Sequence, residues 1–79
     1  MITYKLEYSN EDEIKYTYYP WHDTADTGFI ISDRKGNVIQ KHMTKADDLY
    51  PDYFNEMVGI AYRNAVSKNP EKEGRKCWL

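Results

Sequence analysis

Two histidines and a short acidic loop are the residues of this sequence that could hold a metal ion. His22, Asp23 and Asp26 lie within residues 21–27, and His42 follows later in the chain. Imidazole and carboxylate groups are ordinary ligands for zinc and related ions. Their spacing fits no defined metal-binding motif, and such loops are usually solvated, so we predict no metal and no other cofactor.

Candidate nucleophiles are few and carry no catalytic signature. None of them lies in a pattern such as a nucleophile elbow, and the cysteine is close to the end of the sequence. Adjacent carboxylates at residues 11–13 and 47–48 fall in turns, where acids are usually solvated or cap a helix. We therefore predict no catalytic residues and a protein that is not an enzyme. The nucleophiles considered are Ser9, Ser32, Ser67 and Cys77.

Aromatic side chains are the more informative group, because the chain has eight Tyr, two Trp and two Phe. Four tyrosines share strand faces with Ile and Leu, so we expect most of them in the core with their hydroxyls at its rim. These are Tyr4, Tyr8, Tyr16 and Tyr18.

Other aromatic residues fall outside the main apolar face of their elements, and surface aromatics are over-represented in protein interfaces. An exposed Trp21 beside Tyr19 would make an anchor for a partner; the alternative is that Trp21 folds back over one end of the core. The candidate partner-binding residues are Tyr19, Trp21, His22, Tyr62 and Trp78.

A modest set of basic residues supports an alternative function. Arg34, Lys35, Lys41 and Lys45 surround one predicted hairpin and could form a strip for a nucleic-acid-binding accessory domain. The net charge of the chain is −2, however, and nucleic-acid binders normally concentrate basic charge on one face. We therefore disfavour nucleic acid as a partner.

The elements that would position these residues follow from hydrophobic spacing. Residues 2–8 and 14–19 alternate between apolar and polar side chains, and the turn formers between them predict a hairpin. Pro20 should end the second strand. Residues 29–31 and 38–43 predict a second hairpin, in which Gly36 supplies the positive φ of a bulged turn.

From Leu49 onward the spacing changes to that of a helix. Phe54, Met57, Ala61 and Ala65 share one face, which predicts an amphipathic helix that lies across the sheet. Its start is ambiguous, because Asp48 could cap it and Pro51 prefers a first helical position. We expect its end near residues 69–70, and the apolar end of the tail favours either a docked edge strand or a frayed segment.

The predicted fold is a single α+β domain over residues 1–79. It consists of a four-stranded antiparallel sheet made of two hairpins, a C-terminal amphipathic helix on one face, and room for a short fifth strand. A core this small often needs added stabilisation from disulfides, a metal or a partner subunit. The single cysteine permits no internal disulfide, so a homodimer is left open. Without a signal-like or membrane-spanning run, we expect a cytoplasmic protein with no membrane association.

Several of these features together resemble a group of short, uncharacterised bacterial proteins. The shared features are the Tyr18-Tyr19-Pro20 strand end, the loop into residues 28–31, the Gly36 hairpin, the alanine-bearing helix and the aromatic ending at residues 77–79. This group has no established activity. The function we expect is therefore a small protein-binding or regulatory module, such as an inhibitor of a host or phage protein.

Overall fold

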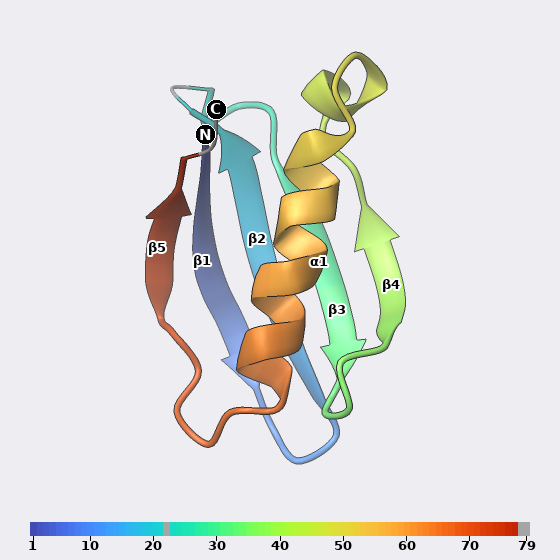
Figure 1. The fold of residues 1–79 in the computed structure, drawn as a ribbon, viewed down its shortest axis with the longest axis vertical. Coiled ribbons are helices and arrows are strands. Elements are labelled where there is room, and N and C mark those ends of the chain that lie inside the picture. Colours follow the sequence, from blue (N-terminus) through green and yellow to red (C-terminus); the bar gives the residue numbers. More distant parts are fainter. Residues whose placement is uncertain (22, 78–79) are drawn as a thin grey trace.

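The computed structural model describes residues 1–21 and 23–77 and shows a five-stranded antiparallel sheet with a helix on one face (Figure 1). In chain order the elements are β1 (Ile2–Ser9), β2 (Glu13–Pro20), β3 (Gly28–Asp33), β4 (Val38–His42), the 3-10 helix η1 (Lys45–Asp48), α1 (Asp52–Ala65) and β5 (Glu73–Lys76). The strand order is β4-β3-β2-β1-β5, so the two hairpins lie side by side and β5 pairs with β1. The predicted α+β fold is confirmed, and the short fifth strand that the sequence left open is present as β5. Whether the end of the tail is docked or frayed concerns residues 78–79, which lie outside the described residues.

The core lies between the sheet and α1, which crosses β2 and β3 (Figure 1). Three tyrosines belong to this core: Tyr4 is 3% exposed, and Tyr16 and Tyr18 are 0% exposed. Their rings fill the layer beneath the helix, and each hydroxyl donates a hydrogen bond at the edge of that layer. The helix contributes Phe54, Met57, Ile60, Ala61 and Ala65.

Tyr8 does not belong to this core, which corrects one expectation from the alternating pattern. The pairing of β1 with β2 shifts register between Leu6 and Tyr8, so that Tyr8 pairs with Lys15. An extra residue at a bulge reverses the alternation of the side chains beyond it. Tyr8 therefore lies on the face of the sheet that is turned away from the helix, and it is 38% exposed.

The second hairpin turns as its glycine predicted. Gly36 has a φ of 93°, in the left-handed region that favours glycine. The Asp33 carboxylate accepts hydrogen bonds from the amides of Lys35 and Asn37, each at 2.9 Å. These contacts hold the turn in place, and the amide of Asn37, as the largest cause, lowers the pKa of Asp33.

The bounds of α1 settle one ambiguity and correct one prediction. The helix begins directly after Pro51, whereas Asp48 belongs to η1. It ends at Ala65, so the predicted end near residues 69–70 is wrong. Asn64 explains the early end, because its side chain oxygen accepts the amide of Glu71 at 2.7 Å and turns the chain back toward β1.

Candidate functional site

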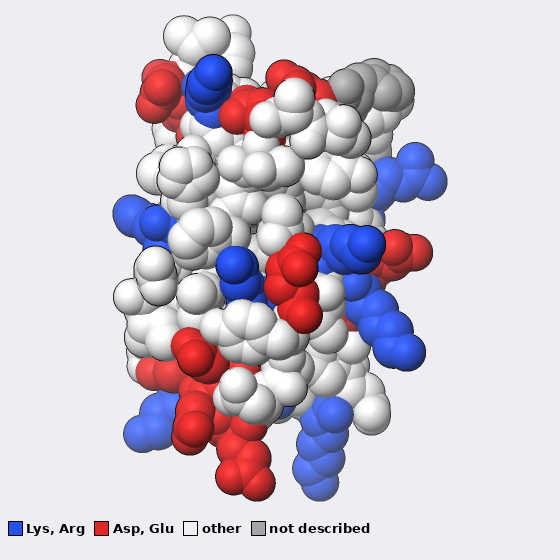
Figure 2. Space-filling view, turned by 180° about the vertical axis from the view of Figure 1, so that it is seen from behind, with Lys and Arg blue, Asp and Glu red and all other residues white. Residues whose placement is uncertain are grey.

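The face of the sheet opposite α1 is open to solvent, because the helix covers one face only. Across this face Thr3 of β1 pairs with Tyr19 of β2 on one side and with Arg75 of β5 on the other. Figure 2 shows an uncharged area in the upper half of the face, between charged side chains at the upper end and others near the middle, along the sides and at the lower end. Part of the open face therefore presents uncharged surface.

A pocket of about 480 Å³ lies on this face where β5, β1 and β2 adjoin. We call it the aromatic pocket. Two aromatic rings and two threonines provide most of its wall, and one acidic and one basic side chain add charge. Its lining residues are Thr3, Tyr19, Trp21, Thr24, Glu73, Gly74 and Arg75.

Local structure explains why Tyr19 and Trp21 meet there. Pro20 ends β2 opposite Ile2, as predicted, and the amide of Trp21 donates to the carbonyl of Met1 at 3.0 Å. The chain then turns, with the amide of Asp23 bonded to the carbonyl of Pro20 at 3.0 Å. The indole is 54% exposed, whereas Tyr19 is partly buried. Trp21 is therefore a surface residue rather than a lid on the core.

The centre of the open face is closed by its own side chains. The rings of Phe29 and His42 stack with centroids 5.9 Å apart and an angle of 20° between their planes. The ammonium group of Lys15 lies 4.6 Å from the centroid of the Phe29 ring, and Ile31 beside it is only 8% exposed. The aromatic pocket therefore lies toward the end of the face that carries Tyr19 and Trp21, away from this covered centre.

Tyr62 lies apart from the aromatic pocket, on α1 and over the second hairpin turn. It is 54% exposed, yet its ring packs so closely on Gly36 that a side chain at that glycine would overlap it. Tyr62 therefore has a structural contact of its own. Its predicted role in partner binding is untested, as are those of His22 and Trp78, which lie outside the described residues.

The four basic residues proposed for nucleic acid occupy different places around the second hairpin. The Arg34 guanidinium donates to the Ser67 carbonyl at 2.9 Å and to the Ser9 hydroxyl at 2.8 Å. The Lys41 ammonium lies 4.9 Å from the Phe54 ring centroid, on the helix side of β4. Lys35 is in the turn, whereas Lys45 begins η1 near the other end of β4. Nucleic-acid binding through these residues stays a prediction.

A buried carboxylate links three parts of the fold. Asp47 is 4% exposed, and one of its oxygens, Oδ2, accepts from the Tyr18 hydroxyl at 2.8 Å and the Thr44 hydroxyl at 2.7 Å. The other oxygen accepts the amide of Phe54 at 2.8 Å, near the start of α1. Burial, followed by the hydrogen bond to Asp47, raises the pKa of Tyr18. The carboxylates at residues 47–48 were expected to be solvated or to cap a helix. Asp47 caps η1, and it also accepts the amide of Phe54 in α1.

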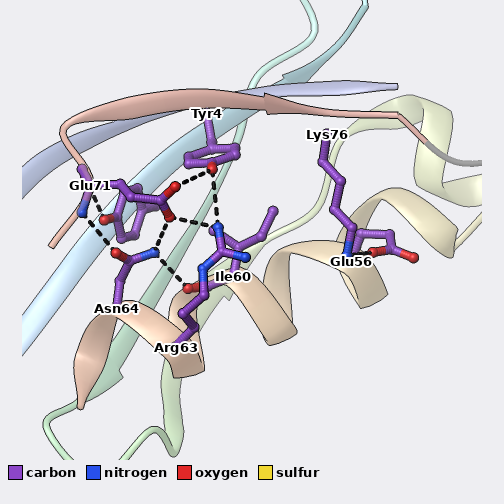
Figure 3. Close-up of polar contacts among 8 residues, drawn as sticks. Tyr4, Glu56, Ile60, Arg63, Asn64, Glu71 and Lys76 are labelled. Atoms are coloured by element: carbon purple, nitrogen blue, oxygen red, sulfur yellow. Dashed lines mark hydrogen bonds and ion pairs between the residues drawn. The ribbon is translucent and has the colours of Figure 1, made fainter. Parts of the chain in front are cut away.

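A second polar cluster joins α1 to the segment before β5 (Figure 3). The Glu71 carboxylate accepts from Arg63 at 2.6 Å, from Asn64 at 2.8 Å and from the Tyr4 hydroxyl at 3.1 Å. The Tyr16 hydroxyl donates to the Glu71 carbonyl at 2.6 Å. Beyond this cluster, Lys76 of β5 forms an ion pair with Glu56 of α1 at 2.6 Å. This cluster was not predicted, because Tyr4 and Tyr16 come from strands that are far from Glu71 in the chain.

The Glu71 cluster changes the acidity of its members. Burial alone would raise the pKa of Glu71, but hydrogen bonds from Asn64, Arg63 and Tyr4 outweigh it and lower that pKa. Burial raises the pKa of Tyr4, and the bond to Glu71 raises it further. Burial also raises the pKa of Tyr16 to about 12. The cluster therefore has a structural function, which is to hold β5 and α1 together.

Two of the residues considered for metal binding, Asp26 and His42, have other contacts, and a third, His22, lies outside the described residues. The Asp26 carboxylate accepts the amides of Lys45 and Ala46 at 2.7 and 3.0 Å, and the His42 ring stacks on Phe29. Among residues 1–21 and 23–77, no three His, Cys, Asp or Glu side chains come close enough together to hold an ion. In the same residues, no helix is long and apolar enough to cross a membrane.

Two exposed apolar residues were missed as surface features by reasoning from the sequence. Leu49 is 78% exposed and Tyr50 is 64% exposed, although their position suggested the start of the helical apolar face. Pro51 separates them from α1 and could have signalled this. Tyr50 also borders a hollow of about 260 Å³ with Met1, Asp52 and Tyr53.

Comparisons with known proteins found no match to any family model, curated protein or solved structure. The resemblance to short bacterial proteins therefore stays a prediction.

Proposed function

We propose that this protein is a non-enzymatic module that binds another protein through the aromatic pocket. The observation that carries the proposal is the position of Tyr19 and Trp21 beside Arg75 in a hollow of the open sheet face. Tyr, Trp and Arg are the residue types most enriched among the anchors of protein interfaces.

The form of the pocket suits a side chain or turn of a partner. Its walls combine apolar rings with the hydroxyls of two threonines, so it offers both contact area and hydrogen bonds to an inserted group. Its floor is rigid, because Thr3 belongs to β1, which is paired with β2 on one side and β5 on the other. A rigid site loses little conformational entropy on binding.

The chemistry of the pocket favours binding over catalysis. Its described lining residues include a carboxylate, a guanidinium and hydroxyls, but neither a histidine nor a cysteine. Histidine is the usual general base of enzyme sites, and cysteine is their most reactive nucleophile. Such a set of groups supports recognition of a partner through shape, aromatic contact and charge.

Affinity capture from the cells that contain the protein tests this proposal. The bait is the tagged wild-type chain, with Trp21→Ala as the pocket variant and Val66→Ala as a control. Trp21 is 54% exposed and Val66 is 56% exposed, so neither truncation should disturb the core. We expect one partner to be captured by the wild-type and Val66→Ala proteins and lost with Trp21→Ala. Equal recovery of every captured protein with Trp21→Ala would show that the pocket is not the binding site.

A further inference from the structure

The strand β5 lies at one edge of the sheet and adds no side chain to the buried core. Three of its four residues are exposed, and the fourth, Gly74, is partly buried. In the strand order of the described residues its one neighbour is β1, with which it pairs from Ile2 opposite Lys76 to Lys5 opposite Glu73. The core residues belong to β1, β2, β3 and α1. A segment with few buried apolar contacts can open while the rest of a protein stays folded.

Polar contacts hold β5 at both of its ends. Just before it, the Glu71 carboxylate accepts from Arg63 at 2.6 Å, and at its last residue Lys76 pairs with Glu56 of α1 at 2.6 Å (Figure 3). The four side chains of these ion pairs are between 29% and 56% exposed, so solvent and salt weaken both pairs. The Glu71 end is the firmer one, because the Tyr16 hydroxyl also donates to the Glu71 carbonyl. Opening should therefore begin at Lys76.

The opposite edge strand, β4, is anchored by buried groups instead. Directly after it, the Thr44 hydroxyl donates to the Asp47 carboxylate at 2.7 Å, and these residues are only 2% and 4% exposed. Directly after β5, the Cys77 thiol lies 2.9 Å from the Met1 sulfur in an exposed contact, and a thiol is a weak donor. Opening is therefore favoured at β5 over β4.

The aromatic pocket depends on β5 for one of its walls. Three of its seven lining residues, Glu73, Gly74 and Arg75, belong to β5. Thr3 of β1 lies between Arg75 on one side and Tyr19 of β2 on the other. If β5 left the sheet, Thr3 and Tyr19 would stay on their paired strands. The hollow would lose the side that carries its two charged groups.

We propose that β5 is a docking strand, which opens from its Lys76 end while the other strands and α1 stay folded, and that the aromatic pocket is complete only when β5 is docked. A partner that contacts both Tyr19 and Arg75 binds the docked state more tightly and so favours docking. Conditions that weaken the two ion pairs lower its apparent affinity by the docked fraction. This regulatory role rests on the function proposed for the pocket, whereas the opening of β5 does not.

Native-state hydrogen exchange, followed by NMR on the full chain at low urea concentrations, tests the opening. The β5 amides that face β1 and the β1 amides that face β5 should share one opening equilibrium. They should exchange at least about tenfold faster than the amides between β2 and β3, with a weaker dependence on urea. The same rate and urea dependence for both sets would overturn the inference, because β5 would then open only with global unfolding.

Variants of the outer ion pair test how β5 is held. Lys76→Gln and Glu56→Gln each remove this pair, so each should speed exchange of the β5 amides about threefold and leave β2 and β3 unchanged. The double variant should be no faster than either single one. The control is Lys72→Gln, the same charge change at an exposed residue just before β5. No acceleration by Lys76→Gln, or equal acceleration by the control, would contradict the proposal.

Gly74→Pro tests the dependence of the pocket on β5. Proline cannot donate to the strand ladder, and a side chain at this position overlaps the Tyr4 hydroxyl. We expect loss of protection in β5, retained protection in β2 and β3, and shifted NMR resonances of Tyr19 and Trp21. Loss of protection in β2 and β3 as well, or unchanged Tyr19 and Trp21 resonances, would overturn the inference. These measurements need no partner, so they distinguish its failure from failure of the function proposed for the pocket.

Discussion

Asp47 links the start of α1 to the sheet through a buried carboxylate. Its carboxylate receives hydrogen bonds from Tyr18 in β2, from Thr44 before η1 and from Phe54 in α1. A buried charge is expensive unless its hydrogen bonds are satisfied, and four donors satisfy this one. The loss of any acceptor leaves buried donors without partners, which costs more than the bond itself contributes.

Replacing Asp47 with Asn should therefore destabilise the protein. One carboxylate oxygen becomes an NH₂ group that faces donors, so we expect a loss of about 2–3 kcal/mol in the free energy of unfolding. Asp48→Asn is the control, because Asp48 is adjacent and exposed, and should change stability by less than about 0.5 kcal/mol. Urea denaturation of both variants measures this. Similar stabilities for the two would contradict the role of Asp47.

The buried tyrosines should make the protein less stable in alkaline solution. The pKa of Tyr16 is raised to about 12 by burial, above the ordinary value of 10.0. The stability that a raised pKa contributes is fully present below pH 10.0 and is lost as the pH rises through the folded pKa. Tyr16→Phe should reduce this loss, whereas Tyr50→Phe, at an exposed tyrosine, should not. Denaturation at a series of alkaline pH values tests the difference, and identical pH profiles would disprove it.

At the scale of elements, β5 is held by side chains as well as by its pairing with β1. Glu71 lies just before β5, and its carboxylate accepts hydrogen bonds from Arg63 and Asn64 of α1. Its carbonyl accepts a hydrogen bond from the Tyr16 hydroxyl. Gly74 is needed within the strand, because a side chain there would overlap the Tyr4 hydroxyl. The strand therefore depends on the core tyrosines beneath it.

The ionised Glu71 carboxylate should stabilise the fold at neutral pH and lose this effect in acid. Its pKa lies below the ordinary 4.5, because hydrogen bonds outweigh the opposing effect of burial. A lowered pKa contributes stability that is present above pH 4.5 and lost as the pH falls through the folded pKa. Glu71→Gln should lower stability at neutral pH and flatten its acid dependence. Glu11→Gln, at an exposed turn residue, serves as the control in acid denaturation. An unchanged acid dependence in Glu71→Gln would count against this.

The second hairpin turn should tolerate no side chain at Gly36. Gly36→Ala combines a left-handed φ, which costs about 1–2 kcal/mol, with overlap of the Tyr62 ring. Gly59→Ala is a matched control on the exposed face of α1, where nothing lies within 4 Å, and should stabilise the protein by about 0.5–1 kcal/mol. Thermal melting compares the two. Equal melting temperatures would contradict the turn geometry.

Local patterns were sufficient to predict most elements, and their failures have physical causes. The strands, the Pro20 stop and the Gly36 turn followed from spacing and backbone preference. The exposure of Tyr8 depends on a bulge, and the end of α1 depends on the bond between Asn64 and Glu71. Both of these arise from contacts between separate segments, which the alternation within a strand and the spacing within a helix do not contain.

For the whole molecule, one face of the sheet is covered and the other is left open. The residues Tyr19 and Trp21 were predicted as binding candidates from their positions outside the apolar faces, and the structure adds Arg75 and Thr3 beside them. Those two could not be predicted, because the pairing of β1 with β5 was not known from the sequence.

The central claim is that the aromatic pocket binds a protein partner, and the affinity of the captured partner tests it most directly. Isothermal titration calorimetry would compare wild-type protein with Trp21→Ala and Val66→Ala. Loss of an interface anchor typically costs about 2 kcal/mol or more, so Trp21→Ala should weaken binding roughly thirtyfold or more. Val66→Ala should bind like the wild type. Equal affinity of all three proteins would contradict the proposed function.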